Sequence, residues 1–141
     1  LLLWNDSLDA SHRMSQQVET STGSYWHAIM HRMEPDYSNA KYWFRTTGDH
    51  PVFKPLHSKV SAYVREGKET DTSSALISGL EYLAAQDRWD PFAFVDLVEQ
   101  AAAAATTAGV EPLQRIQKWE IMLLLDYTWH ACCGGKLFES I

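Results

Sequence analysis

The chain has 141 residues, of which 45% are hydrophobic and 21% charged, and its formal net charge is −6. This length suits a single domain over residues 1–141, and the apolar content excludes an intrinsically disordered chain. An acidic chain without a basic stripe argues against a nucleic-acid partner, because Lys and Arg neutralise the phosphates in such complexes. No apolar run approaches the ~20 residues of a membrane-spanning helix, so no membrane partner is expected.

The two cysteines, Cys132 and Cys133, are neighbours in the sequence. Adjacent cysteines rarely form an unstrained disulfide, since the backbone positions their Cβ atoms poorly. With no third cysteine as a partner, a reducing cytoplasm is the expected compartment. The opening residues Leu1–Trp4 are too short for the apolar core of a signal peptide, and the polar residues Asn5 and Asp6 follow directly.

Apolar residues recur at three- and four-residue steps along nearly the whole chain, which is the period of an amphipathic helix. This pattern predicts a first helix over residues 1–19, with His12 on its inward-facing stripe. The polar run Ser21–Ser24 is expected to end that helix and to cap a second one, over about residues 24–34.

Stop and start signals predict the next two helices. Asp36 is the expected N-cap of a third helix over about residues 36–46, and Gly48 is its expected stop. Pro55 can be the first residue of a fourth helix that ends at Gly67.

Three further helices complete the expected fold. A polar, loop-like run over residues 68–74 precedes a fifth helix over about residues 74–86. Asp90 followed by Pro91 predicts the start of a sixth helix, and the longest helix is expected over about residues 112–132. No alternating pattern typical of β-strands competes with these helices. The sequence therefore predicts an all-α single domain, an irregular bundle of six or seven helices.

Residues 25–53 contain seven aromatic residues and three of the six histidines. The segment includes the stretches Tyr-Trp-His-Ala-Ile-Met-His-Arg (Tyr25–Arg32), Asp-Tyr-Ser-Asn-Ala-Lys-Tyr-Trp-Phe-Arg (Asp36–Arg45) and His-Pro-Val-Phe (His50–Phe53). These stretches resemble the motif of a family of uncharacterised bacterial proteins of unknown function. The resemblance implies no activity, substrate or cofactor, so functional hypotheses depend on the residues themselves.

His27 and His31 are four residues apart on the predicted second helix, so both rings project from one face. Two imidazoles at this spacing can share a divalent transition metal, with further ligands from elsewhere in the fold. The candidate further ligands are His12, Glu19, Glu34, Asp36, His50, Asp126 and His130. A zincin site is excluded, because Ala28 stands where that motif needs its general-base glutamate. The alternative is that both histidines bridge helices through hydrogen bonds or lie in solvent.

Two other histidines have open roles. His12 is expected either as a buried, hydrogen-bonded side chain or as a ligand or acid–base group. Asp126 and His130 are four residues apart, which suits a carboxylate that orients an imidazole and equally suits an ordinary surface pair. A nucleophilic role for Cys132 or Cys133 is disfavoured, because the negative end of a helix dipole disfavours a thiolate.

Cations, aromatic residues and an amide are close together in the same segment. Cations beside aromatic walls could bind the carboxylate or phosphate of a small anionic molecule. Alternatively, the cations pair with nearby carboxylates and stack on the aromatic rings, so that they hold two helices together. The candidate ligand-binding residues are Trp26, Arg32, Asn39, Lys41, Trp43 and Arg45.

Two functional hypotheses follow. The first is a small-ligand or metal-binding domain with its site on residues 25–53; if it is an enzyme, a metal-assisted or histidine-mediated hydrolysis is the expected reaction. The second is a structural or protein-interaction domain without catalytic activity. In that case the aromatic segment forms core and a partner-binding surface, and the Ala-rich sixth helix packs against another subunit of a homo-oligomer.

Overall fold

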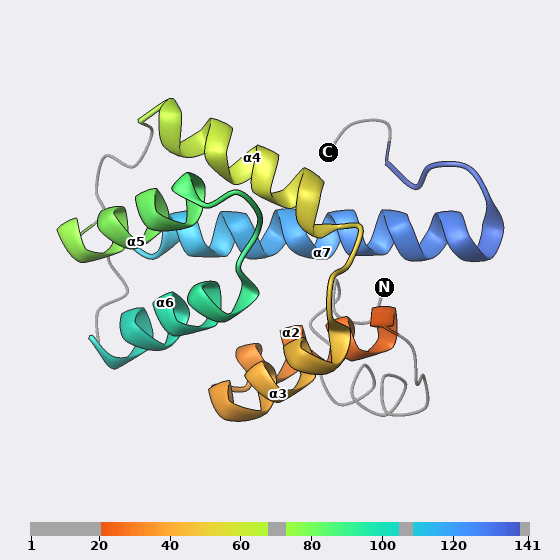
Figure 1. Cartoon of the computed structure of the whole chain (residues 1–141), viewed down its shortest axis with the longest axis horizontal. Coiled ribbons are helices and arrows are strands. Elements are labelled where there is room, and N and C mark those ends of the chain that lie inside the picture. Colours follow the sequence, from red (N-terminus) through yellow and green to blue (C-terminus); the bar gives the residue numbers. More distant parts are fainter. Residues whose placement is uncertain (1–20, 68–72, 105–108, 139–141) are drawn as a thin grey trace. The chain divides into compact units, whose positions relative to one another are not determined.

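The computed structural model describes residues 21–67, 73–104 and 109–138 (Figure 1). These residues form six α-helices, and none of them lies in a β-strand. The predicted all-α fold is therefore confirmed for the described part of the chain. The predicted helix over residues 1–19, with its His12, lies outside the described residues.

The chain divides into two compact units, Leu1–His50 with Leu124–Ile141, and Pro51–Leu123. The longest helix, α7 (Glu111–Cys133), contributes residues to both of them. None of the described helices combines the length and the apolar content that crossing a membrane requires.

The first unit contains a helical hairpin formed by α2 (Ser21–Met33) and α3 (Tyr37–Thr47). Asp36 is the N-cap of α3, as predicted, and Gly48 ends the helix with a φ of +66°, which glycine adopts without strain. The buried side chains between α2 and α3 are mainly apolar and aromatic: Tyr25, Ile29, Met30, Ala40 and Phe44.

The prediction that residues 21–24 cap a helix starting near residue 24 is wrong, because these residues are themselves helical in α2. Ser21 and Thr22 make tertiary hydrogen bonds instead of caps. Ser21 Oγ donates to the Thr47 carbonyl at 2.7 Å, and Thr22 Oγ1 lies 3.2 Å from His50 Nε2. The start of α2 is thereby tied to the end of α3.

The second unit contains α4 (Phe53–Arg65), α5 (Ser74–Ala85), α6 (Pro91–Ala103) and the first part of α7. The prediction that α4 starts at Pro55 is wrong by two residues. Proline is tolerated anywhere in the first turn, where its missing N–H has no intrahelical partner to lose. The helix therefore extends back to Phe53, which is buried together with Val52.

Helices α5 and α6 begin at capping residues. Ser73 Oγ accepts from Leu76 N, and Asp90 Oδ1 accepts from Phe92 N at 2.9 Å and from Ala93 N at 3.0 Å. The predicted start of the sixth helix at Asp90 and Pro91 is thus confirmed. Each cap of this kind stabilises its helix by about 1 kcal/mol.

The two helices approach closely at a glycine. A Cβ added to Gly79 of α5 would lie 2.4 Å from Leu97 Cδ1 of α6. Leu97 is itself 5% exposed, so it packs into the space that the missing side chain leaves. This contact brings α5 alongside α6 (Figure 1).

Candidate functional site

The two histidines of the predicted metal site form a ring stack with Trp43 in the first unit. The His27 and Trp43 rings are 4.0 Å apart between centroids and 4° from parallel, and the His27 and His31 rings are 5.3 Å apart and 6° from parallel. His27 is 2% exposed, whereas His31 and Trp43 are half-buried. The four-residue spacing on α2 brings the imidazoles together, and Trp43 of α3 completes the stack.

Parallel rings are a poor starting geometry for binding one metal ion. A histidine nitrogen donates its lone pair in the plane of its ring, so two ligands of one ion need planes that meet at the metal. Within the described ranges, no group of three His, Cys, Asp or Glu side chains is arranged to hold a metal ion. Metal binding by His27 and His31 stays a prediction that requires one ring to rotate.

The three predicted anion-binding cations have different surroundings. Arg32 is 2% exposed, and its guanidinium carbon lies 5.9 Å from the centre of the Phe44 ring. Lys41 is half-buried and Arg45 is exposed. Arg32 therefore packs in the hairpin, where a solute cannot reach it without local opening, whereas Arg45 is accessible.

Asn39 and Trp26 hydrogen-bond to other side chains within the first unit. Asn39 Nδ2 donates to Asp36 Oδ2 at 2.7 Å, and Trp26 Nε1 donates to Thr128 Oγ1 at 3.4 Å. The bonds from Asn39 and the charge of His31, whose Nδ1 lies 3.4 Å from Asp36 Oδ2, lower the pKa of Asp36, because they favour its ionised form. Both predicted ligand-binding side chains thus take part in the internal bonding of the unit.

Asp126 and His130 do not form the carboxylate–imidazole pair that their spacing suggests. Asp126 Oδ1 accepts hydrogen bonds from the backbone N–H groups of Leu137 at 2.7 Å and Phe138 at 3.4 Å. His130 Nδ1 lies 3.0 Å from the Gly135 carbonyl oxygen. Each side chain instead contacts the backbone that follows α7 at hydrogen-bond distance.

His50 lies in an aromatic enclosure of the first unit. Its ring meets Tyr25 and Tyr127 edge-to-face, with centroids 5.1 and 4.8 Å away, and its Nε2 lies 3.2 Å from Thr22 Oγ1. Only 3% of the residue is exposed. Burial lowers the pKa of His50 below its usual value, because it disfavours the charged imidazolium, and the opposing charge of Asp49 is the smaller effect.

The lowered pKa of His50 predicts that the protein loses stability on acidification. The unfolded chain binds a proton near the usual His pKa of 6.5, whereas folded His50 binds it only at a lower pH. At a pH between the pKa values of the folded and the unfolded chain, unfolding takes up a proton. The free energy of unfolding therefore falls as the pH falls through this range, and His50 does not affect it at higher pH. His50→Gln, whose amide can still reach Thr22, should reduce this slope in urea denaturation series between about pH 5 and 8.

His57→Gln is the matched control for this experiment. His57 is also half enclosed, with its Nε2 3.2 Å from the Leu83 carbonyl oxygen, but it lies in the second unit. The comparison shows whether the change of slope comes from the burial of His50 or from the loss of any histidine. An equal change of slope in both variants, or none in His50→Gln, would contradict the prediction.

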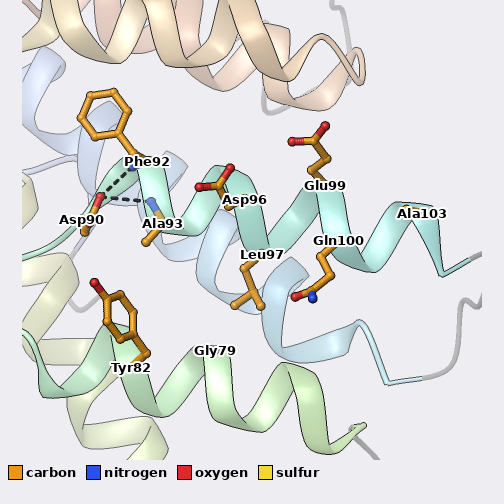
Figure 2. Close-up of a pocket in the computed structure, with 10 residues that line it drawn as sticks. All are labelled: Gly79, Tyr82, Asp90, Phe92, Ala93, Asp96, Leu97, Glu99, Gln100 and Ala103. Atoms are coloured by element: carbon orange, nitrogen blue, oxygen red, sulfur yellow. Dashed lines mark hydrogen bonds between the residues drawn. The ribbon is translucent and has the colours of Figure 1, made fainter.

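The second unit carries a groove of about 680 Å³ along α6, bordered by α5 (Figure 2). Its apolar lining comes from both helices: Gly79, Tyr82, Phe92, Ala93, Leu97 and Ala103. Its polar lining comes from α6 and its N-cap: Asp90, Asp96, Glu99 and Gln100. The groove is therefore part apolar and part acidic, and none of the described residues that line it is a Lys, Arg or His.

The period of α6 places the lining on one broad face of the helix. Ala93, Asp96, Leu97 and Gln100 follow one another at three- and four-residue steps. In Figure 2, Leu97 and Gln100 point toward α5, whereas Asp96 and Glu99 point away from it. The apolar floor and the acidic flank of the groove thus come from the same helix.

Sequence reasoning did not identify this groove. The alanine-rich run that begins at Ala101 indicates close packing against a neighbour, and the structure places Ala103 of this run in the groove lining. A sharper signal was available in the stripe that contains Ala93, Asp96 and Leu97, because small, acidic and apolar residues alternate there at helical spacing. The contribution of Tyr82 and Gly79 could not be expected, since it depends on how α5 packs beside α6.

No family model matches the chain, and no curated protein or solved structure is significantly similar to it. The resemblance to an uncharacterised bacterial family therefore depends only on the three stretches within residues 25–53. Those stretches form most of α2, most of α3 and the residues that lead into α4. The function of the chain has to be argued from its own surfaces.

Proposed function

We propose that the protein is an interaction domain that binds a segment of another polypeptide in the groove along α6. The observation that carries the proposal is the groove itself, about 680 Å³ in volume and lined by residues from Asp90 to Ala103. That stretch of helix is about 20 Å long, which matches several turns of a bound helix rather than a compact small molecule.

The exposure of the lining favours a polypeptide over an enclosed ligand. Small-molecule sites bury most of their ligand's surface. Here Tyr82 is 55% exposed, and Asp96, Glu99, Gln100 and Ala103 are all exposed. Leu97, by contrast, is buried, so the groove offers an apolar floor below an accessible polar flank. Amphipathic helices bind to surfaces of this kind through apolar residues at three- and four-residue spacing.

This proposal keeps the interaction hypothesis from the sequence, but the binding surface is the groove along α6 instead of the segment 25–53. The aromatic segment 25–53 would serve mainly as packing, as the burial of Tyr25, His27 and Phe44 indicates. The two thiols at the end of α7, Cys132 and Cys133, are free and exposed, which suits the reducing cytoplasm expected from the sequence.

The test is selection of binding peptides followed by blocking of the groove. Peptides of random sequence, displayed on phage, would be selected on the wild-type protein and their affinities measured by fluorescence anisotropy. Ala93→Trp and Ala103→Trp place a bulky ring in the lining, and both should weaken binding by on the order of ten-fold or more. Ala102→Trp is the matched control, because Ala102 is exposed on the same helix but does not line the groove.

Circular dichroism would show that each variant remains helical. Because Ala103 is exposed, its replacement does not disturb the core, so a loss of affinity there reports on the groove alone. Selected peptides that bind all three tryptophan variants as tightly as the wild type would overturn the proposal. Protection of residues 25–53 by those peptides in hydrogen exchange would point to the first unit instead.

A further inference from the structure

We infer that the groove along α6 recognises a cationic amphipathic helix, one that presents Lys or Arg beside its apolar residues. The inference rests on the proposed function and deepens it, because it names the chemistry of the partner. It starts from the charges on the described lining, where Asp90, Asp96 and Glu99 are present without any cation.

The three carboxylates differ in how accessible their charge is to a partner. Asp90 is half-buried and accepts the backbone N–H groups of Phe92 and Ala93, so its main role is to cap α6. Asp96 and Glu99 are exposed and lie three residues apart on the helix, which places their side chains on neighbouring positions of the surface. The accessible negative charge is therefore concentrated at Asp96 and Glu99.

The apolar part of the lining suits the stems of basic side chains as well as aliphatic residues. Lys and Arg bury their methylene stems on apolar surface while the charged group stays in water. Tyr82, 55% exposed across from α6, offers a ring face of the kind that cations prefer. A helix with Leu or Met toward Leu97 and with Lys or Arg toward Glu99 would satisfy both parts of the groove.

A second copy of this chain fits less well. The chain carries a net charge of −6, and all of the excess acid lies in residues 61–141, which include α5 and α6. Pairing this face with itself would bring Asp96 and Glu99 close to the same residues of the partner, and like charges in an interface are unfavourable. Charge complementarity therefore selects a basic partner over a homodimer through this groove.

The probes are three designed peptides of one length, each with leucine on one helix face. The polar face carries Lys in the first peptide, Gln in the second and Glu in the third. Fluorescence anisotropy should show that the Lys peptide binds on the order of ten-fold more tightly than the Gln peptide at low salt, and that the Glu peptide binds least. Raising the salt from about 0.05 to about 0.5 M should remove most of the difference, because screening shortens the range of the attraction.

Charge reversal locates the attraction on the protein. Asp96→Lys with Glu99→Lys should abolish the preference for the Lys peptide. Glu81→Lys with Asp87→Lys changes the net charge by the same amount at exposed positions that do not line the groove, and should reduce the affinity by less than about two-fold. An equal loss in both double variants would mean general attraction to an acidic protein, and would overturn the inference.

The outcomes separate the two claims. In one outcome, the Lys and Gln peptides bind the wild type with the same affinity and Ala103→Trp blocks both equally. The groove then binds helices without selecting cations, so the inference fails and the proposed function stands. If no peptide responds to Ala103→Trp, the proposed function fails as well. A concentration-dependent dimer in sedimentation equilibrium that Ala103→Trp dissociates would identify a second copy as the occupant, and would also overturn the inference.

Discussion

Replacing His27 by alanine is expected to lower the free energy of unfolding by about 2–4 kcal/mol. The residue is 2% exposed, and its ring stacks on Trp43 at 4.0 Å and on His31 at 5.3 Å. Alanine would leave a cavity between α2 and α3 and would remove both ring contacts. Urea denaturation followed by circular dichroism measures the change.

The same variant distinguishes packing from metal binding. Protein purified without a metal-affinity column would be analysed for zinc, nickel, iron and manganese, in the wild type and in His27→Ala. If His27 is a packing residue, its replacement changes stability and leaves the metal content unaltered. Near-stoichiometric metal that disappears from a folded and equally stable His27→Ala protein would contradict this prediction and would establish the metal site instead.

His130→Ala is the control for that comparison. His130 is also a histidine four residues from a carboxylate, but it is exposed, and its Nδ1 lies 3.0 Å from the Gly135 carbonyl oxygen. Because exposed side chains contribute little, its replacement should change the free energy of unfolding by less than about 1 kcal/mol. A loss as large as that of His27→Ala would show that burial does not explain the difference between the two histidines.

Helix ends could be predicted where a local signal determines them. Asp36 and Asp90 accept backbone N–H groups that no residue within the helix can satisfy, and Gly48 adopts a positive φ that other residues avoid. Where tertiary contacts extend a helix, local signals were insufficient. Phe53 is helical and buried, although Pro55 is the stronger local start signal.

Side-chain partners across helices could not be predicted from periodicity. The helical period predicts that His27 lies on a helix and which residues share its face. It does not predict which residue of α3 contacts His27, because that depends on how the two helices pack. In the structure this residue is Trp43. Glu120 illustrates the same limit. It is fully buried on the stripe that contains Ile116 and Leu124, where an apolar residue is expected.

Replacing Phe94 by alanine is expected to lower the free energy of unfolding by about 3–5 kcal/mol, a large fraction of the ~5–15 kcal/mol of a typical domain. Phe94 is 0% exposed, and its ring lies 5.2 Å from that of Trp89. If residues 1–141 fold as one domain, this loss in the second unit also destabilises the first. Native-state hydrogen exchange should then accelerate at Phe44 and Ile29 as much as at Leu80.

The expectation of one cooperative transition depends on α7, because this helix contributes residues to both units and its two parts lose packing contacts when either unit unfolds. Tyr82→Ala is the control: the residue is an aromatic of the second unit that is 55% exposed, and its removal should cost less than about 1 kcal/mol. If Phe94→Ala accelerates exchange at Leu80 and leaves Phe44 unchanged, the units unfold separately. The single domain expected from the length of the chain would then have to be replaced by two domains that share a helix.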